Sequence, residues 1–375
     1  MRILIAPNSM KGSITATEFA NVVEKAFLEV SGDFSIRKVP VADGGDFTGE
    51  VLRQALGAEQ VFHEVLDPLG RKINAQFAVS KKTAIIEMAD ASGIKLLQAH
   101  ELNPLKTSTY GTGQLIARAI ELGCTEILLG IGGSATVDGG TGMMEALGFT
   151  LLDGNNSPVP GNGENTGVVR KILKKRYPDN LSLKIICDVD NPLLGSKGAA
   201  SVFAPQKGAT PQTVQTLEKG LKNWVQVLEA ETDKELANLK GAGAAGGIAL
   251  PLLAFFNAEI VRGADFILKK LHFERDTEWA DLVITGEGKI DHQTLSDKAP
   301  KAVADWARKA GKPVIAIGGA VENDASGSFD GIFSFLPGPL SLTESMKNSK
   351  KLLFDFSREL AKFILKLKNQ KFREQ

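Results

Sequence analysis

The chain has 375 residues, of which 43% are hydrophobic, and its 44 basic and 44 acidic side chains give a net charge of zero. This balance argues against a nucleic-acid binder, and the length predicts two domains. Cys124 and Cys187 form neither a disulfide framework nor a zinc motif. The sequence contains no signal-peptide pattern and no run of 18 apolar residues. We therefore expect a reduced, cytoplasmic protein without nucleic-acid or membrane partners.

The first elements alternate strand and helix. Residues 3–6 predict a strand, and a capping box at Thr15 predicts a helix start. Lys11 lies in the loop between them, at the edge where open parallel sheets bind ligands, although it could also be a solvated loop lysine. A second strand over 36–41 is followed by Asp43 and two glycines. Asp43 could bind a cation or a substrate hydroxyl, or only cap the next helix.

The pattern then changes to three short runs rich in β-branched residues, at 61–66, 73–79 and 83–88. Such runs separated by turns predict an antiparallel meander. Strand and helix alternate again towards the C-terminus. These patterns predict one discontinuous doubly wound α/β domain, 1–60 with 275–375, and a mixed α/β domain inserted at 61–274.

The stretch 126–147 combines an apolar strand, a glycine-rich turn and a helix start. Its turn contains Gly132, Gly133 and Ser134, followed by Thr136. Glycines let backbone N–H groups approach a phosphate, and a helix N-terminus favours negative charge. The alternative is a tight connection whose glycines serve packing only. Asp138 in the same turn suits Mg²⁺ better than it suits phosphate.

Two later strands are also followed by acidic loops. A strand over 184–187 leads into Asp188 and Asp190, which predict a metal or hydroxyl site or an Asx-rich turn. A strand over 281–285 is followed by glycines, acids and a lysine: Gly286, Glu287, Gly288, Asp291 and Lys298.

Several reaction classes lack their motifs here. The sequence has no Walker A motif, no protein-kinase HRD or DFG, no G-x-S-x-G and no HExxH. The segment 241–246 matches G-x-G-x-x-G but does not follow a strand, which disfavours a dinucleotide site. The sequence does contain another set of candidate site residues: lysines, carboxylates, glycines and hydroxyls that directly follow predicted strands. Phosphoryl transfer needs this set, because lysines and backbone N–H groups offset phosphate charge while carboxylates hold Mg²⁺.

Long motifs follow one another along the chain, among them IAPNSMKGSITATEFA, VPVADGG, IEMADASG, NPLKTSTYGTG, IGGSATVDGGTGMMEALG, CDVDNPLLG, FAPQKGAT and ITGEGKIDHQTL. In these motifs, and over essentially its whole length, the sequence resembles the type I glycerate kinase family. The resemblance implies phosphorylation of D-glycerate by ATP with Mg²⁺, with 2-phosphoglycerate favoured over 3-phosphoglycerate as the product. It also implies a flavodoxin-like domain and a restriction-enzyme-like domain with the active site in the cleft between them. The sequence leaves a homo-oligomer open.

Within this resemblance, we assign hypothetical roles to the strand-end residues. Lys11 and Lys298 would stabilise charge on the transferring phosphoryl group. Asp43 and Asp291 would act as a base or orient the substrate. Asp188 and Asp190 would bind Mg²⁺ or the substrate hydroxyl. The phosphate contacts would come from Gly132, Gly133, Ser134, Thr136, Gly286 and Gly288, and the metal ligands from Glu287 and Asp190.

Five positions depart from the family pattern, namely Asn8, Asp46, Phe47, Val137 and Asp297. Phe47 and Val137 could change the substrate pocket, which keeps open a kinase of another small hydroxy acid. A second alternative is a nucleotide-binding regulator without activity. The retained lysines and carboxylates argue against it.

Overall fold

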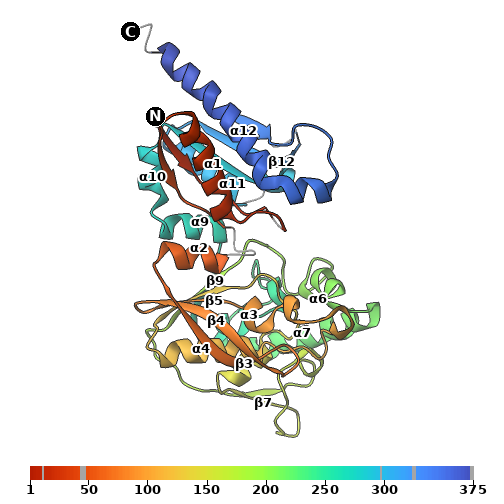
Figure 1. Cartoon of the computed structure of the whole chain (residues 1–375). Coiled ribbons are helices and arrows are strands. Elements are labelled where there is room, and N and C mark those ends of the chain that lie inside the picture. The colour runs from red at the N-terminus through yellow and green to blue at the C-terminus, as the bar shows by residue number, and fades with distance from the viewer. Residues whose placement is uncertain (11, 43–47, 296–297, 323–326, 372–375) are drawn as a thin grey trace. The chain divides into compact units, whose positions relative to one another are not determined.

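The computed structural model describes residues 1–10, 12–42, 48–295, 298–322 and 327–371 (Figure 1). Its internal contacts divide the chain into two compact units. The first unit is Met1–Asp43 with Gly263–Gln375, and the second is Gly44–Arg262. The sequence analysis instead divides the chain near residues 60 and 274, and that assignment of domains stays a prediction.

The first unit contains a five-stranded sheet, with every described pair of neighbouring strands parallel. The strand order is β13-β12-β11-β1-β2. Strand β1 lies between β2 and β11 in the sheet. From β1 the chain adds β2 on one side, and it later adds β11, β12 and β13 on the other side. The direction in which strands are added therefore reverses between β1 and β11. Ligands bind at such reversal points in open α/β sheets. The strands are β1 (Arg2–Ile5), β2 (Ser35–Lys38), β11 (Leu282–Ile290), β12 (Val314–Val321) and β13 (Gly331–Ser334).

Helices cover both faces of this sheet. Alternate residues of a strand point to opposite faces, so Ile3 and Ile5 enter one hydrophobic cluster while Leu4 enters another. The first cluster includes residues of α1 and α12, which lie side by side, and the second includes residues of α9, α10 and α11 (Figure 1). The helices are α1 (Ala16–Val30), α9 (Gly263–Lys270), α10 (Phe273–Trp279), α11 (Ala299–Lys309) and α12 (Leu342–Lys371).

The second unit contains a mixed six-stranded sheet in the order β10-β9-β6-β5-β4-β3. Strands β3, β4 and β5 pair antiparallel, which confirms the predicted meander, and β5, β6, β9 and β10 pair in parallel. The strands are β3 (Glu59–Leu66), β4 (Lys72–Ser80), β5 (Thr83–Glu87), β6 (Glu126–Gly130), β9 (Ser182–Ile186) and β10 (Asn257–Val261), with a separate hairpin of β7 (Thr150–Leu152) and β8 (Lys171–Leu173).

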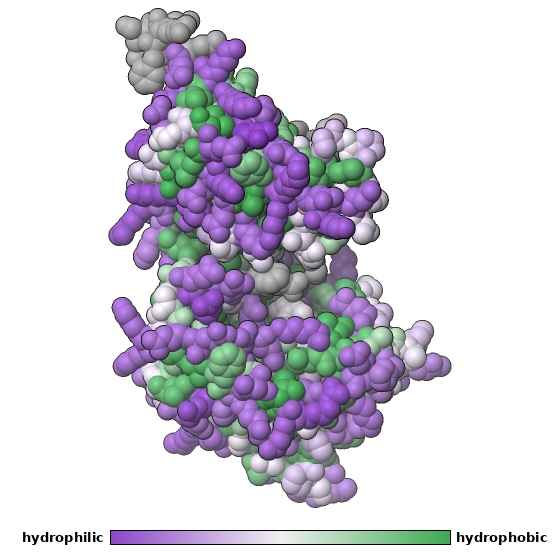
Figure 2. All heavy atoms as spheres, viewed as in Figure 1, coloured by the Kyte–Doolittle hydropathy of each residue, from purple (hydrophilic) through white to green (hydrophobic). Residues whose placement is uncertain are grey.

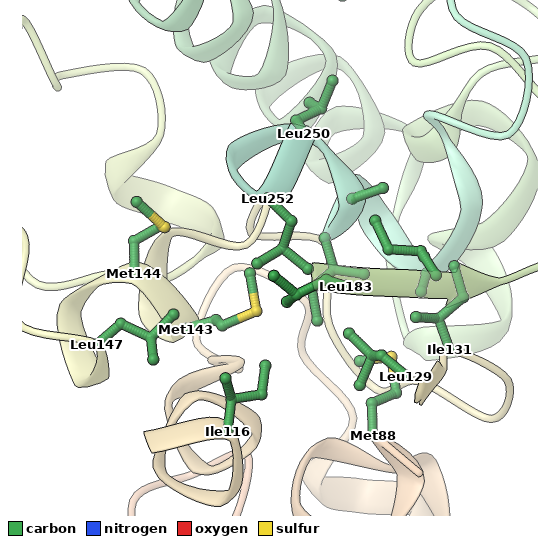
Figure 3. Close-up of a cluster of buried hydrophobic side chains, with 14 of the residues drawn as sticks. Met88, Ile116, Leu129, Ile131, Met143, Met144, Leu147, Leu183, Leu250 and Leu252 are labelled. Atoms are coloured by element: carbon green, nitrogen blue, oxygen red, sulfur yellow. The ribbon is translucent and has the colours of Figure 1, made fainter. Parts of the chain in front are cut away.

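A single large hydrophobic core joins this sheet to its helices. In Figure 3, Leu129 of β6 and Leu183 of β9 lie among Ile116, Met143 and Leu252, which come from three helices. Both cysteines are buried, as expected. The helices are α2 (Thr48–Ala55), α3 (Ala89–Ser92), α4 (Tyr110–Glu121), α5 (Thr141–Ala146), α6 (Ala199–Phe203), α7 (Pro211–Thr232) and α8 (Ala249–Phe255).

The observed unit boundaries differ from those predicted near residues 60 and 274. Helix α2 follows β2 in sequence, but it contacts β4 and β5 of the second unit. Helices α9 and α10 contact α11 of the first unit. The sequence prediction grouped each helix with its neighbour in the chain, whereas packing groups it with the sheet whose apolar face it covers.

The α/β class is confirmed, while the flavodoxin-like and restriction-enzyme-like assignments stay predictions. On the face shown in Figure 2, hydrophilic side chains predominate and hydrophobic ones are interspersed among them. Among the described residues, no helix has the length and hydrophobicity needed to cross a membrane.

Candidate active site

The glycine-rich turn after β6 presents unused backbone donors. In the described part of the chain, the N–H groups of Gly132, Gly133 and Ser134 make no hydrogen bond. Gly133 has φ +68°, in the left-handed region that glycine adopts without strain, and it is exposed. The carbonyl of Gly133 is held in place, because the Ile94 N–H donates to it at 2.9 Å. Successive free N–H groups around a left-handed residue form an anion-binding concavity.

The N-terminus of α5 is occupied by a side chain of the protein itself. Asp138 is fully buried, and its carboxylate accepts hydrogen bonds from Thr109 N at 2.8 Å, Thr109 Oγ1 at 2.7 Å and Gly140 N at 3.1 Å. Burial raises the pKa of Asp138, and these hydrogen bonds oppose the rise. The carboxylate therefore serves the loop internally and is not placed as a Mg²⁺ ligand. Gly132, Gly133 and Ser134 therefore stay the predicted phosphate contacts of this segment.

Thr136 and Val137 are fully buried behind this turn. Val137 belongs to the hydrophobic core, so it packs internally rather than lining a pocket. The Thr136 carbonyl accepts a hydrogen bond from Lys207 Nζ at 2.7 Å, and the same ammonium donates to Ser134 Oγ at 2.6 Å. The sequence analysis did not single out Lys207. Its motif FAPQKGAT was the available signal, but a lysine in a short polar segment reads as a surface residue.

The two aspartates after β9 lie in different surroundings. Asp188 is half-buried, whereas Asp190 is exposed, with Arg262 at 3.5 Å and Lys240 at 3.9 Å from its carboxylate. These two cations already offset the charge of Asp190. A divalent ion at Asp190 would therefore meet nearby positive charge.

In the first unit, a polar cluster forms where β11 ends. Glu287 and Asp291 are buried, with 7% and 5% exposure. The Thr294 hydroxyl donates to Glu287 Oε1 at 2.6 Å, and the Asp291 N–H donates to Thr294 Oγ1 at 3.0 Å. Lys298 Nζ lies 4.0 Å from Glu287 Oε2 and is one-third exposed. One threonine thus holds two carboxyl-bearing residues beside a lysine.

A lysine bridges the outer carboxylates of this cluster. Lys289 Nζ lies 3.0 Å from Asp291 Oδ2 and 2.6 Å from Glu322 Oε1, and these contacts raise the pKa of Lys289, that to Glu322 most strongly. Asp291, His292 and Glu322 also present three ligand atoms within 4.8 Å of one another. The ammonium of Lys289 stands between two of the three, so it competes with any metal ion there.

Strand β11 is longer than the predicted strand over 281–285, because it continues to Ile290. Gly286 and Gly288 are therefore strand residues rather than loop residues. The Gly286 carbonyl accepts from Asn8 N–H at 2.8 Å, and a Cβ on Gly286 would lie 2.2 Å from the Ile317 carbonyl oxygen. Gly286 is thus required for close strand packing, and it places buried Asn8 at the reversal point of the sheet.

Some predicted positions fall outside the described residues, namely Lys11, Asp43, Asp46, Phe47 and Asp297. Their assigned roles stay predictions. The described candidates form two separate groups, one in each unit.

The family model for the glycerate kinase family matches residues 3–365. The chain belongs to the glycerate kinase family. It is therefore an enzyme of the phosphotransferase class, which confirms the resemblance stated from the sequence motifs.

Curated relatives and a solved structure agree with this membership. A glycerate kinase of Halalkalibacterium halodurans is 43% identical over 368 residues, which cover 96% of this chain and 97% of the relative. A glycerate 2-kinase of Escherichia coli K12 is 40% identical, with 96% and 97% coverage. The crystal structure of a Salmonella typhimurium LT2 protein assigned as glycerate kinase 2 is 39% identical, with a TM-score of 0.88 over 99% of both chains.

Proposed function

We propose that this glycerate kinase family member transfers the γ-phosphoryl group of ATP to the 2-hydroxyl of D-glycerate, giving 2-phosphoglycerate and ADP. The observation that carries the phosphate site is the run of three unused N–H groups at Gly132, Gly133 and Ser134. The choice of the 2-hydroxyl rests on the Escherichia coli relative, which is a glycerate 2-kinase.

The reaction forms one O–P bond and breaks another. The substrate hydroxyl oxygen attacks the γ-phosphorus, the bond to the β-phosphate oxygen breaks, and the hydroxyl proton passes to a carboxylate. Asp291 is our choice for that carboxylate among the described residues, with Asp43 as the second candidate. Such transition states are loose, so holding the groups in line matters more than the strength of the base. Lys298, and Lys11 by the family resemblance, would offset charge on the moving phosphoryl group.

Mg²⁺ suits the donors at the end of β11. The ion prefers carboxylate oxygens, and Thr294 holds Glu287 and Asp291 by hydrogen bonds to the Glu287 carboxylate and from the Asp291 N–H. In our proposal Glu287 is the metal ligand, because Lys289 contacts the Asp291 carboxylate. When bound, Mg²⁺ would neutralise phosphate charge. Chelation with EDTA should abolish turnover, and added Mg²⁺ should restore it.

A coupled ADP-release assay with Mg·ATP and D-glycerate tests the proposal, followed by ³¹P NMR of the product. We expect turnover and the resonance of 2-phosphoglycerate. A 3-phosphoglycerate resonance would overturn the assigned hydroxyl. Turnover only with another acid in a panel of small hydroxy acids would overturn the substrate while keeping the reaction class.

A further inference from the structure

Lys207 is a lysine buried without a carboxylate partner. Only 1% of its surface is exposed, at the end of the 3₁₀ helix Pro205–Lys207. Within the described residues its ammonium has two hydrogen bonds, to Ser134 Oγ at 2.6 Å and to the Thr136 carbonyl at 2.7 Å, and no ion pair. Lysines are rarely buried to this extent unless they are paired, because removing a charge from water is costly. The protein bears this cost directly behind the glycine turn.

The electrostatic surroundings leave this charge incompletely balanced. Burial lowers the pKa of Lys207 to about 7, and the negative charge of Asp138 opposes that change. Asp138 is the titratable neighbour with a resolved influence among the described residues. Its carboxylate is already used by Thr109 and Gly140. A negatively charged ligand close to the turn would therefore favour the charged form of Lys207.

The hydrogen bond from Lys207 links the buried ammonium to the Ser134 hydroxyl in the glycine turn. Because the Ser134 oxygen accepts from the ammonium, its own hydrogen stays available to a further acceptor. The N–H of Ser134 and those of Gly132 and Gly133 make no hydrogen bond among the described residues. The turn thus carries four donors, and the Lys207 ammonium bonds directly to the Ser134 hydroxyl oxygen.

The rigid packing behind the turn supports this arrangement. The Gly139 N–H donates to the Gly246 carbonyl at 2.9 Å, and a Cβ on Gly246 would lie 2.3 Å from the Thr136 carbonyl oxygen. Trp224 Nε1 donates to the Gly139 carbonyl at 2.8 Å. These contacts fix the backbone around Gly139 in addition to the hydrogen bond from Lys207 to the Thr136 carbonyl.

We propose that Lys207 is a positioning residue for the nucleotide, whose buried ammonium orients the Ser134 hydroxyl and supplies positive charge to a phosphate bound at Gly132–Ser134. The proposal rests on the phosphate site of the proposed function. Lys207 touches the protein and not the ligand, so it acts through Ser134. Its charged form binds the nucleotide, and ATP affinity consequently falls as the pH rises above 7.

The test compares Lys207→Met, Lys207→Arg and Ser134→Ala with the wild type and with Lys72→Met, which removes an exposed lysine of the same unit. Equilibrium dialysis gives the Kd of Mg·ATP at pH 7 and pH 9, steady-state assays give the KM of D-glycerate, and thermal unfolding reports folding. We expect Lys207→Met to raise the Kd of Mg·ATP about tenfold or more at pH 7, with the KM of D-glycerate within about twofold. The Kd of Mg·ATP for the wild type should rise between pH 7 and pH 9. Because arginine stays charged, the Kd for Lys207→Arg should be the same at both pH values.

Three results would overturn the inference. One is a folded Lys207→Met whose Kd matches that of Lys72→Met. Another, which needs no lysine variant, is a wild-type Kd that stays constant between pH 7 and 9. The third is a Ser134→Ala variant with unchanged ATP affinity, because this variant lacks the hydroxyl through which Lys207 is proposed to act. It keeps the three backbone N–H groups, so this result would leave the phosphate site of the proposed function in place. If instead the nucleotide effects appear but D-glycerate is not phosphorylated, the proposed substrate fails and the role of Lys207 stands.

Discussion

The two groups of candidate residues use charge in opposite ways. In the second unit, Asp138 and Lys207 have almost no exposed surface, and they bond to the turn around Ser134. In the first unit, Lys289 is half-exposed and Lys298 one-third exposed, beside carboxylates where β11 ends. In the second unit, buried charges shape the backbone around the glycine turn. In the first unit, the buried carboxylates Glu287 and Asp291 lie beside lysines that are partly exposed.

This difference teaches how a phosphotransferase can divide its work. A glycine turn offers N–H groups that bind phosphate without titrating, but it needs internal partners to hold its shape. Proton transfer and metal binding need side chains that ligands can reach. Substitutions in the group of the first unit should therefore lower turnover. Substitutions in the group of the second unit should lower stability or nucleotide affinity.

We expect the largest effect, a loss of turnover, when Glu287 is replaced by glutamine. Glu287→Gln keeps the size of the side chain and a hydrogen-bond acceptor for Thr294, but it removes the negative charge. We expect kcat to fall about 10²–10⁴-fold, with little change in Tm. Steady-state kinetics and thermal unfolding measure both. Glu278→Gln, an exposed exchange in the same unit, is the matched control. Near-normal turnover in the Glu287 variant would break the comparison.

Asp138→Asn should damage the fold instead. The carboxylate accepts from Thr109 and Gly140, and a neutral amide would turn a donor group towards some of those donors. Breaking a buried network of this kind costs about 3–5 kcal/mol. Urea unfolding should show this loss, whereas Asp179→Asn, an exposed exchange in the same unit, should show none. A stable but inactive Asp138 variant would instead point to a chemical role.

Gly133→Ala should produce a smaller, mixed effect. A Cβ at φ +68° costs about 1–2 kcal/mol, and relief of that strain would rotate the neighbouring N–H groups. We expect slightly lower stability together with about tenfold weaker Mg·ATP binding. Gly154, which does not have a positive φ and whose Cβ would meet no close neighbour, provides the control exchange to alanine. Unchanged nucleotide affinity would move the phosphate site away from this turn.

A further prediction concerns the pH dependence of stability. The pKa of Lys207 is about 7 in the folded chain and 10.5 in the reference state, so the unfolded chain binds more protons between these values. The destabilising effect of the buried ammonium is complete below pH 7 and disappears as the pH rises towards 10.5. The free energy of unfolding of the wild type should therefore increase relative to that of Lys207→Met between pH 7 and 9.5. Urea unfolding at both values measures it, and a constant difference would contradict it.

Several features followed from local sequence patterns. The alternating runs over 61–88 predicted the meander, because the side-chain period of a half-buried strand is visible in sequence. The turn Gly132–Ser134 was also recognised, since glycines after an apolar run mark a strand–turn connection. Family motifs then identified the reaction class, which the family model confirms.

By itself, then, the sequence determined the α/β class, the glycine turn and the glycerate kinase family, because short-range periodicity and motifs record them. Only the tertiary structure decided that α2 packs on the second unit, that β11 runs through Gly286, and that Lys207 lies buried behind Ser134. Ser134 and Lys207 are 73 residues apart in the chain. A lysine's burial depends on which distant segments enclose it, and no local pattern around Lys207 records that enclosure.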